Sequence, residues 1–555
     1  MASAETKTLP GPADWLRLVV LCLVLYASGI TLLPPVDRDE ARFAQATRQM
    51  VESRDFVRIR FQEEPRHKKP IGIHWLQAGA VAICGNADTS RIWPYRLPSL
   101  LGAVLAAVLT MYCGAFLFDR LTGQLAGLLV ACCLLLTVEA HLATTDAMLL
   151  AAVVAAQGAL ARCYLRTRSG QPVAMGTALA FWVAQGLGWL LKGPVITLIS
   201  VLTAGSLCLA DRQVRWLRTL RIPWGLVVMV LMLAPWAIAV SIATQGAFFH
   251  DALRSDLVPK LMGGQESHGF PPGFYLLLMP LTFWPASLFT GVAVYLAWTR
   301  RALPAERFCL AWCLPTWLVF ELIPTKLPHY ILPVYPALAL LCARAMSTIT
   351  EVDPALTRNR WLRLACAAWA AITVVIGAAL VAIPWWLSGR LQLLPLLPAA
   401  AAVLTATLAV RRLLRGQLQT AAHLLVVGSL LTLAPTFHGI LPNLDQLWLS
   451  RNIAQAVATH PPSPAAAPVP IASAGYDEPS LVFLLGTGTK LLSAEQAACY
   501  LQEHPKALAV ISGENEQAFQ KKVTDLGIVA RNLESIRGFN YTKGRWLTVS
   551  LYTLE

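Results

Sequence analysis

The sequence predicts a polytopic α-helical membrane protein that carries a separate α/β domain at its C-terminal end. Of the 555 residues, 56% are hydrophobic and only 14% are charged, whereas an ordinary soluble domain has about 25% charged residues. The apolar residues gather in runs long enough to cross a bilayer. After Pro442 the composition becomes polar, and short strand-like runs alternate with helix-like runs.

Apolar segments occupy most of the first 440 residues. A hydrocarbon core about 30 Å thick requires roughly 20 apolar residues in a helix, and 13 segments approach that length. The first segment could be a signal peptide, but only Lys7 and Arg17 charge its flank and a charged motif follows, so an uncleaved anchor is expected. The segments are residues 15–34, 96–118, 122–138, 146–165, 175–191, 193–210, 222–243, 273–298, 306–322, 328–347, 361–387, 393–413 and 419–437.

Arginine-rich loops follow every even-numbered segment. Examples are the loops that contain Arg166, Arg215, Arg301 and Arg412. By the positive-inside rule these loops and the N-terminus are cytoplasmic, and 13 spans then place the C-terminus outside. We therefore expect a multi-pass protein of the bacterial inner membrane with a periplasmic C-terminal domain. The same rule accounts for the net charge of +14, so no nucleic-acid partner is expected.

Two domains are expected, a transmembrane domain over residues 1–442 and an outer α/β domain over 443–555. The first outer loop, about residues 37–95, should contain two helices that rest on the membrane. In residues 40–54 the side chains of Phe43, Ala46 and Met50 share one face. Residues 71–83 are apolar but too short to span.

The predicted outer domain contains a Pro/Ala-rich linker near residues 461–470. Helices are expected over residues 493–503 and 515–526. Strands are expected over residues 469–474, 481–485, 507–511 and 546–552.

Two acidic positions on the outer side are candidate catalytic sites. Asp39, with Glu40 and Arg42, lies in the motif Asp37-Arg38-Asp39-Glu40-Ala41-Arg42-Phe43, where the first segment leaves the bilayer. Asp146 begins an apolar segment, a position where a charged side chain is costly and marks a functional candidate. The alternative is that both belong to loops whose charges are simply solvated.

Cations also gather on the outer side, where the positive-inside rule does not expect them. Snorkelling explains any single lysine, but a bound phosphate explains the set, because its oxygens require cations and hydrogen-bond donors. The set comprises Lys69, Lys192, Arg254, His268, Lys326 and His329, together with the hydroxyl donor Tyr330.

At these motifs the chain resembles the GT-C membrane glycosyltransferases, most closely the ArnT-type lipid A aminoarabinose transferases, which are related to the protein O-mannosyltransferases. The similar pieces follow one another in order through roughly the first 340 residues. They are Asp39-Glu40-Ala41-Arg42, Lys69-Pro70, Thr145-Asp146-Ala147, Lys192-Gly193-Pro194, His268 followed by Phe274-Tyr275, and the run from Lys326 to Pro333.

The resemblance implies roles for individual residues. It places Asp39 and Asp146 in the active cavity and gives the lipid phosphate to Lys69, Arg254 and Tyr330, with Lys192 as a further cation. Where such proteins commonly have Glu before the Lys-Pro step, this chain has Lys68. That departure weakens any metal site implied there, so no cofactor is assigned and a divalent metal is left open.

The function implied is inverting transfer of 4-amino-4-deoxy-L-arabinose from undecaprenyl phosphate to a lipid A phosphate, with membrane lipids around the enzyme. One alternative is transfer of another sugar to lipopolysaccharide core or to a protein hydroxyl, where an aspartate would act as a base. A third hypothesis is a transporter or lipid flippase, but transporters usually carry charges near the membrane midplane and contain internal repeats. Here the charges lie at the outer ends of the segments.

Overall fold

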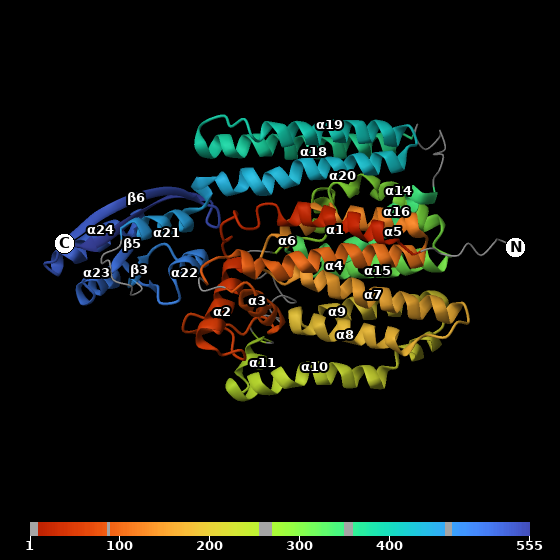
Figure 1. Cartoon of the computed structure of the whole chain (residues 1–555), viewed down its shortest axis with the longest axis horizontal. Helices are drawn as coiled ribbons and strands as arrows, with labels where there is room; N and C mark the ends of the chain where they lie inside the picture. The colour runs from red at the N-terminus through yellow and green to blue at the C-terminus, as the bar shows by residue number, and fades with distance from the viewer. Residues whose placement is uncertain (1–8, 86–88, 253, 255–268, 349–358, 461–468) are drawn as a thin grey trace.

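The computed structural model describes residues 9–85, 89–252, 254, 269–348, 359–460 and 469–555. A long bundle of helices forms one part of the molecule, and a small mixed sheet with its own helices forms the other. Figure 1 shows α2 and α3 between the bundle and the sheet domain, which lies at the left end. The C-terminus lies in that domain, and the described part of the chain begins at the opposite end of the bundle.

Each of the 13 predicted apolar segments overlaps a helix or a bent pair of helices. Seven described helices are long and apolar enough to cross a membrane, or up to nine if each bent pair counts as one span. The predicted number of 13 spans is therefore not confirmed. The bundle helices are α1 (Pro12–Ala27), α4 (Trp93–Leu117), α5 (Arg120–Ala131), α6 (Leu134–Ala140), α7 (Asp146–Arg168), α8 (Met175–Lys192), α9 (Val195–Asp211), α10 (Ile222–Ala243), α13 (Phe274–Thr282), α14 (Thr290–Thr299), α15 (Pro304–Leu322), α16 (Tyr335–Thr348), α18 (Arg360–Ser388), α19 (Leu396–Leu414) and α20 (Leu418–Pro435).

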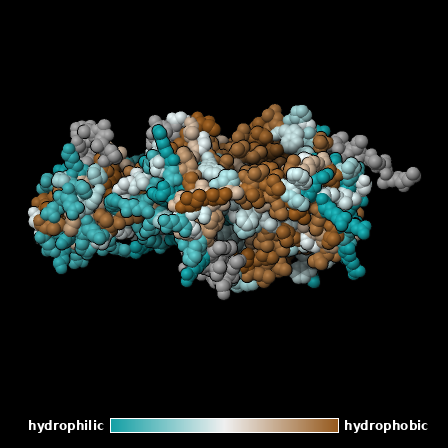
Figure 2. Space-filling view, turned by 90° about the horizontal axis from the view of Figure 1, so that it is seen from below, coloured by the Kyte–Doolittle hydropathy of each residue, from teal (hydrophilic) through white to brown (hydrophobic). Residues whose placement is uncertain are grey.

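The outer surface of the bundle exposes apolar side chains, as expected of a surface that contacts lipid. The most apolar stretch of α10 is only 11% buried inside the protein and that of α18 only 22%, whereas that of the central helix α7 is 72% buried. Large apolar side chains at the bundle surface need an apolar solvent. Figure 2 shows hydrophobic side chains over the bundle and hydrophilic ones over the sheet domain and the opposite end. The chain is a multi-pass membrane protein.

Helices are present at both positions where juxtamembrane helices are predicted. α2 (Asp39–Ser53) has Phe43, Ala46 and Met50 on its buried side, as its periodicity predicts, but they pack inside the protein rather than on a membrane surface. A short hairpin of β1 (Arg60–Phe61) and β2 (Glu64–Pro65) leads to α3 (Gly72–Ile83), whose 12 residues are too few to span. A Cβ on Gly72 would lie 2.6 Å from the Leu190 carbonyl oxygen, so glycine permits α3 to touch the end of α8.

The sheet of the C-terminal domain has the strand order β4-β3-β5-β7-β6, with β3 parallel to β4 and β5 and with β7 antiparallel to β5 and β6. Three predicted strands and both predicted helices are confirmed. The elements are α21 (Leu449–Thr459), β3 (Ile471–Ala474), α22 (Pro479–Leu485), β4 (Lys490–Leu491), α23 (Ala494–Glu503), β5 (Leu508–Ser512), α24 (Gly513–Asp525), β6 (Ala530–Asn540) and β7 (Arg545–Leu554).

The strand predicted at residues 481–485 is wrong, because these residues belong to α22. Pro479 occupies the first helical turn, where its missing N–H costs nothing, and Leu481, Val482 and Phe483 are buried. A short apolar run does not by itself distinguish strand from buried helix. The predicted linker lies mostly outside the described residues. We propose a domain division at residues 442 and 443, because short helical turns follow α20 there.

Candidate active site

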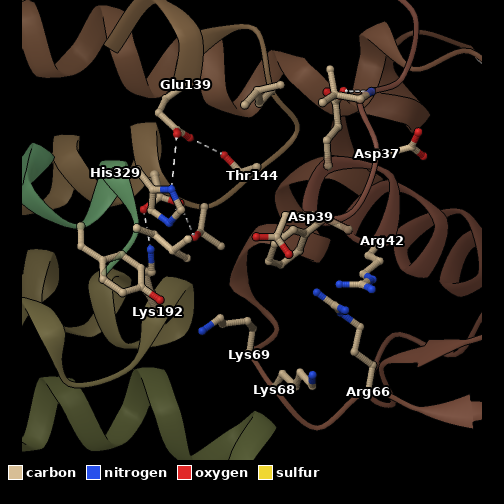
Figure 3. A pocket seen from close by; sticks show the side chains of 18 of the residues that line it. Asp37, Asp39, Arg42, Arg66, Lys68, Lys69, Glu139, Thr144, Lys192 and His329 are labelled. Carbon is tan, nitrogen blue, oxygen red and sulfur yellow. Dashed lines mark hydrogen bonds and ion pairs between the residues drawn. The ribbon is translucent and has the colours of Figure 1, made fainter. Parts of the chain in front are cut away.

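A charged cavity of about 220 Å³ lies where the bundle meets α2 and the loop before α3 (Figure 3). The ends of several helices converge on it, so the backbone changes direction around the cavity and presents polar side chains. The cavity is lined by Val36, Asp37, Asp39, Glu40, Arg42, Phe43, Arg66, Lys68, Lys69, Glu139, Leu142, Thr144, Thr145, Asp146, Lys192, Thr325, Leu327, His329 and Tyr330.

Asp146 and Lys192 form an ion pair in the wall of this cavity. Asp146 is the first residue of α7 and Lys192 the last of α8, so each charge complements the dipole of its own helix end. The Lys192 Nζ lies 2.5 Å from the Asp146 Oδ1, and both side chains are largely buried. Gly102 of α4 lets the start of α7 approach closely, because a Cβ there would lie 2.5 Å from the Met148 backbone.

His329 connects this pair to a second carboxylate. Its Nε2 lies 4.0 Å from Asp146 Oδ2 and its Nδ1 lies 3.8 Å from Glu139 Oε1. The Thr144 hydroxyl donates to Glu139 Oε2 at 2.9 Å. The Lys192 ammonium also lies 5.1 Å from the centre of the Tyr330 ring. Acidic, basic and hydroxyl groups from four segments thus share one wall.

Glu40 has a different environment from Asp39, although the two are adjacent. Arg96 of α4 donates to both oxygens of Glu40 at 2.8 Å, and the backbone N–H groups of Val36 and Ala143 donate to them as well. Glu40 is 2% exposed, whereas the Asp39 side chain is open to the cavity. Glu40 therefore joins three segments around the cavity, and Asp39 faces its contents.

Cations form the opposite wall. Figure 3 shows Arg42 and Arg66 pointing toward each other beside Asp39, with Lys68 and Lys69 below them. The Arg66 guanidinium lies 5.1 Å from the centre of the Phe43 ring. Arg42, Arg66 and Lys68 also line a second hollow of about 360 Å³, which reaches Asp477 and Pro479 of the C-terminal domain. The cavity therefore continues toward the C-terminal domain along cationic side chains.

Most of the predicted site residues come together in the cavity wall. They are Asp39, Glu40, Arg42, Lys69, Asp146, Lys192, His329 and Tyr330.

Three predicted site residues are not part of the described wall. Lys326 is buried and donates to the carbonyl oxygens of Phe270 and Ile323, at 2.8 and 2.6 Å. Arg254 is exposed beyond α11 (Ala247–Asp251). His268 lies outside the described residues. Lys326 therefore ties chain segments together here, whereas its neighbours Thr325 and Leu327 line the cavity.

Three charged residues of the site and its support are not predicted from the sequence: Glu139, Arg66 and Arg96. Glu139 follows an apolar segment directly, and Arg96 begins a span on the outer side, so both are charges at span ends like those of Asp146 and Lys192. Arg66 had no comparable signal, because it lies in a loop with many charges. Among the described residues no three His, Cys, Asp or Glu side chains are grouped to hold a metal ion.

Asp37 lies at the outer edge of the cavity, beside the C-terminal domain. The pKa of its carboxyl is raised to about 6, chiefly by burial and also by the nearby Glu478 charge, although hydrogen bonds from Ser480 oppose the rise. The unfolded-state pKa is about 3.9. The folded protein therefore binds the extra proton, and the Asp37 charge destabilises it increasingly as the pH rises from about 4 to 6.

We expect Asp37→Asn to stabilise the protein at neutral pH by about 1–3 kcal/mol, because the amide keeps an acceptor for Ser480 without the charge. The measurement is thermal unfolding of the purified full chain from pH 4 to pH 8. The difference from wild type should grow up to about pH 6 and then stay level. A difference in stability that does not change with pH would contradict the assignment of the destabilisation to the charge of the Asp37 carboxyl.

A membrane bundle whose helix ends converge on a charged cavity beneath an α/β domain is a GT-C fold, as comparison with solved structures shows. ArnT from Cupriavidus metallidurans in the apo state has a TM-score of 0.73 at 19% identity, over 97% of each chain. The same protein bound to undecaprenyl phosphate has a TM-score of 0.72 at 19% identity, over 97% of this chain and 98% of that one. The archaeal oligosaccharyltransferase AglB from Archaeoglobus fulgidus, in complex with an inhibitory peptide and a dolichol-phosphate, has 0.51 at 13% identity, over 91% and 69%.

Within this class the sequence is similar to aminoarabinose transferases, which confirms the predicted resemblance to ArnT-type proteins. The undecaprenyl phosphate-alpha-4-amino-4-deoxy-L-arabinose arabinosyl transferase of Pectobacterium carotovorum subsp. carotovorum (strain PC1) is 26% identical over 363 residues, 65% of this chain and 63% of the relative. That of Enterobacter sp. (strain 638) is 26% identical over 378 residues, 66% and 65%. The match thus spans less than two thirds of these relatives. The family profile described as dolichyl-phosphate-mannose-protein mannosyltransferase matches residues 68–238.

Proposed function

We propose that this chain is an inverting glycosyltransferase that moves 4-amino-4-deoxy-L-arabinose from undecaprenyl phosphate to a phosphate of lipid A. The observation that carries the proposal is a cavity that combines carboxylates and cations at one end of a membrane bundle. The choice of donor and sugar follows the names of the similar proteins, which are undecaprenyl phosphate-alpha-4-amino-4-deoxy-L-arabinose arabinosyl transferases.

In the proposed reaction, an oxygen of the acceptor phosphate attacks the anomeric carbon from the face opposite the leaving group. The bond between that carbon and the undecaprenyl phosphate oxygen breaks, and the leaving phosphate takes the electron pair. An acceptor phosphate is already anionic, so no strong base is needed. The protein contributes mainly by stabilising charge where it develops.

We assign the leaving phosphate to Lys69, Lys192 and Tyr330, which line one side of the cavity. We assign to Asp39 and Asp146 the pairing with the sugar amine and the orientation of the neighbouring cations. We assign to Glu40 a supporting role without direct contact to the substrate, because its oxygens accept hydrogen bonds from Arg96 and from backbone N–H groups. Among the residues that the structure describes, the cavity lining does not include Arg254 or Lys326, so no role in phosphate binding is proposed for them.

The acceptor phosphate requires cations of its own, because two phosphates near one carbon repel each other. Arg42, Arg66 and Lys68 line both the cavity and the adjoining hollow. We assign the approach of the acceptor to this side. Arginine suits it, because a guanidinium binds phosphate oxygens in pairs.

The proposed location is the bacterial inner membrane, with the cavity and the C-terminal domain on the periplasmic side. Basic loops at the end of the bundle away from the cavity support this orientation. At that end Arg168 and Arg307 both bind Asp211, and Arg344 binds Asp119.

Cysteine-accessibility labelling tests the orientation. Positions near Asp37, Lys326 and Glu503 should react with an impermeant reagent from outside, and positions near Arg215 and Arg412 only from the cytoplasm, because the two sets lie on opposite sides of the proposed membrane. Cytoplasmic labelling near Glu503 would contradict the proposed orientation.

Purified protein in detergent, supplied with the undecaprenyl phosphate-linked aminosugar and lipid A, tests the function. We expect lipid A to gain the mass of one aminopentose. A transporter would give no product. Transfer to a lipopolysaccharide core or protein hydroxyl in place of lipid A would support the alternative acceptor.

A further inference from the structure

The turn between β6 and β7 of the C-terminal domain reaches the residues directly before Asp39. The Asp37 backbone N–H donates to the Tyr541 hydroxyl oxygen at 2.7 Å. The Arg38 guanidinium donates to the Thr542 carbonyl oxygen at 3.1 Å. The Ser480 N–H, at the start of α22, donates to Asp37 Oδ1 at 3.1 Å. Two consecutive residues of the first outer loop are thus bonded to residues more than 400 positions away.

The backbone held by these contacts is strained. Arg38 has φ +67° and ψ −103°, a conformation that side chains with a Cβ rarely adopt. Such strain persists only where the surroundings enforce it. Arg38 directly precedes Asp39, the first residue of α2. A change at Arg38 would therefore alter the direction in which the Asp39 carboxylate enters the cavity.

The turn that makes these contacts is itself fixed. Asn540 Nδ2 donates to Glu478 Oε1 at 3.1 Å, and the Thr542 hydroxyl donates to the same oxygen. The Thr542 N–H donates to Asn540 Oδ1 at 3.1 Å. Because the turn is bonded within its own domain, it can hold the Asp37-Arg38 backbone rather than follow it.

We propose that Tyr541 is a positioning residue, through which the C-terminal domain holds the strained Asp37-Arg38 backbone and so aims Asp39 into the cavity. Its effect on turnover rests on the proposed function, whereas its effect on the loop does not. The C-terminal domain then contributes to the active site without placing Tyr541 on the substrate.

Tyr541→Phe tests the proposal, because it keeps the ring and removes the hydroxyl that accepts from Asp37. Tyr552→Phe is the matched control, since its hydroxyl binds Glu516 on α24 within the same domain. In the full-length protein, hydrogen exchange should accelerate roughly 5-fold in a peptide covering residues 33–43 of Tyr541→Phe, as expected for one lost hydrogen bond. The same peptide should be unchanged in Tyr552→Phe.

In the transfer assay, Tyr541→Phe should lower kcat by about 10-fold to 100-fold with both KM values unchanged, the size expected when a catalytic group is misplaced by about 1 Å. Wild-type kcat, or faster exchange spread through the whole C-terminal domain, would overturn the positioning role. If wild-type protein transfers no sugar, the proposed function fails, and the exchange of residues 33–43 then decides the loop contact alone.

Discussion

Lys69→Ala should leave no detectable sugar transfer while the protein is still made and folded. Lys69 lies in the loop before α3, and Figure 3 shows its ammonium pointing into the cavity toward the side of Lys192. In the proposed reaction negative charge builds on the leaving phosphate. Removing one preorganised charge from such a site commonly costs about 100-fold to 1,000-fold in rate, and the loss of donor binding adds to this.

The measurement is product formation under saturating acceptor, with donor concentration varied. Lys521→Ala is a suitable control, because Lys521 is an exposed lysine on α24 of the C-terminal domain. It should behave like wild type. Near-normal turnover in Lys69→Ala would remove Lys69 from the site and would leave Lys192 and Tyr330 as the phosphate-binding groups.

The sequence predicts which charged residues lie at the ends of apolar segments better than it predicts the direction in which their side chains point. Asp146 and Lys192 can be identified from the sequence because Asp146 begins one apolar segment and Lys192 follows another, and the packing of α7 against α8 brings these two ends together. Lys326 also lies just beyond an apolar segment, but its ammonium turns to the carbonyls of Phe270 and Ile323. Rotation about a helix or turn depends on tertiary packing, which span counting does not include.

Burial also separates neighbours that sequence treats alike. Asp39 and Glu40 belong to one charged motif, yet only Glu40 is enclosed by Arg96 and backbone donors. Arg96 lies 56 positions away, so the pairing could not be predicted from local pattern. The strand β6 is not predicted from the sequence either. Most of its residues are exposed or only partly buried, so its apolar signal is weak.

Bent helices account for part of the difference between the 13 predicted spans and the seven to nine that the described helices allow. The helices α1 and α9, with 16 and 17 residues, are also short for a span. α5 and α6 meet at 61°, and the segment from Phe274 to Thr299 bends by 116°. Hydropathy is insensitive to such breaks, since the residues on both sides stay apolar. Glu139 lies on α6, after the break, and lines the cavity. The break that makes the spans difficult to count therefore also contributes to the site.

Asp39→Asn and Asp146→Asn should each lower the rate of transfer by about 100-fold to 1,000-fold, because each removes a positioned charge. The two should differ in stability. Asp39 is open to the cavity, so its replacement should leave the unfolding temperature unchanged. Asp146 binds the buried Lys192 at 2.5 Å, so its replacement leaves that charge poorly compensated and should lower the unfolding temperature.

The dependence of these two variants on pH distinguishes the acceptors. If Asp39 or Asp146 deprotonated a hydroxyl acceptor, raising the pH should partly restore the activity of its asparagine variant, because a more basic medium replaces the lost base. A phosphate acceptor already carries its negative charge, so the aspartates act through charge and position alone. We therefore expect the rate of each variant, relative to wild type, to stay flat between about pH 7 and pH 9, since the acceptor phosphate is already ionised there. Recovery of Asp39→Asn at high pH would instead indicate a hydroxyl acceptor, since only that reaction requires the carboxylate to remove a proton.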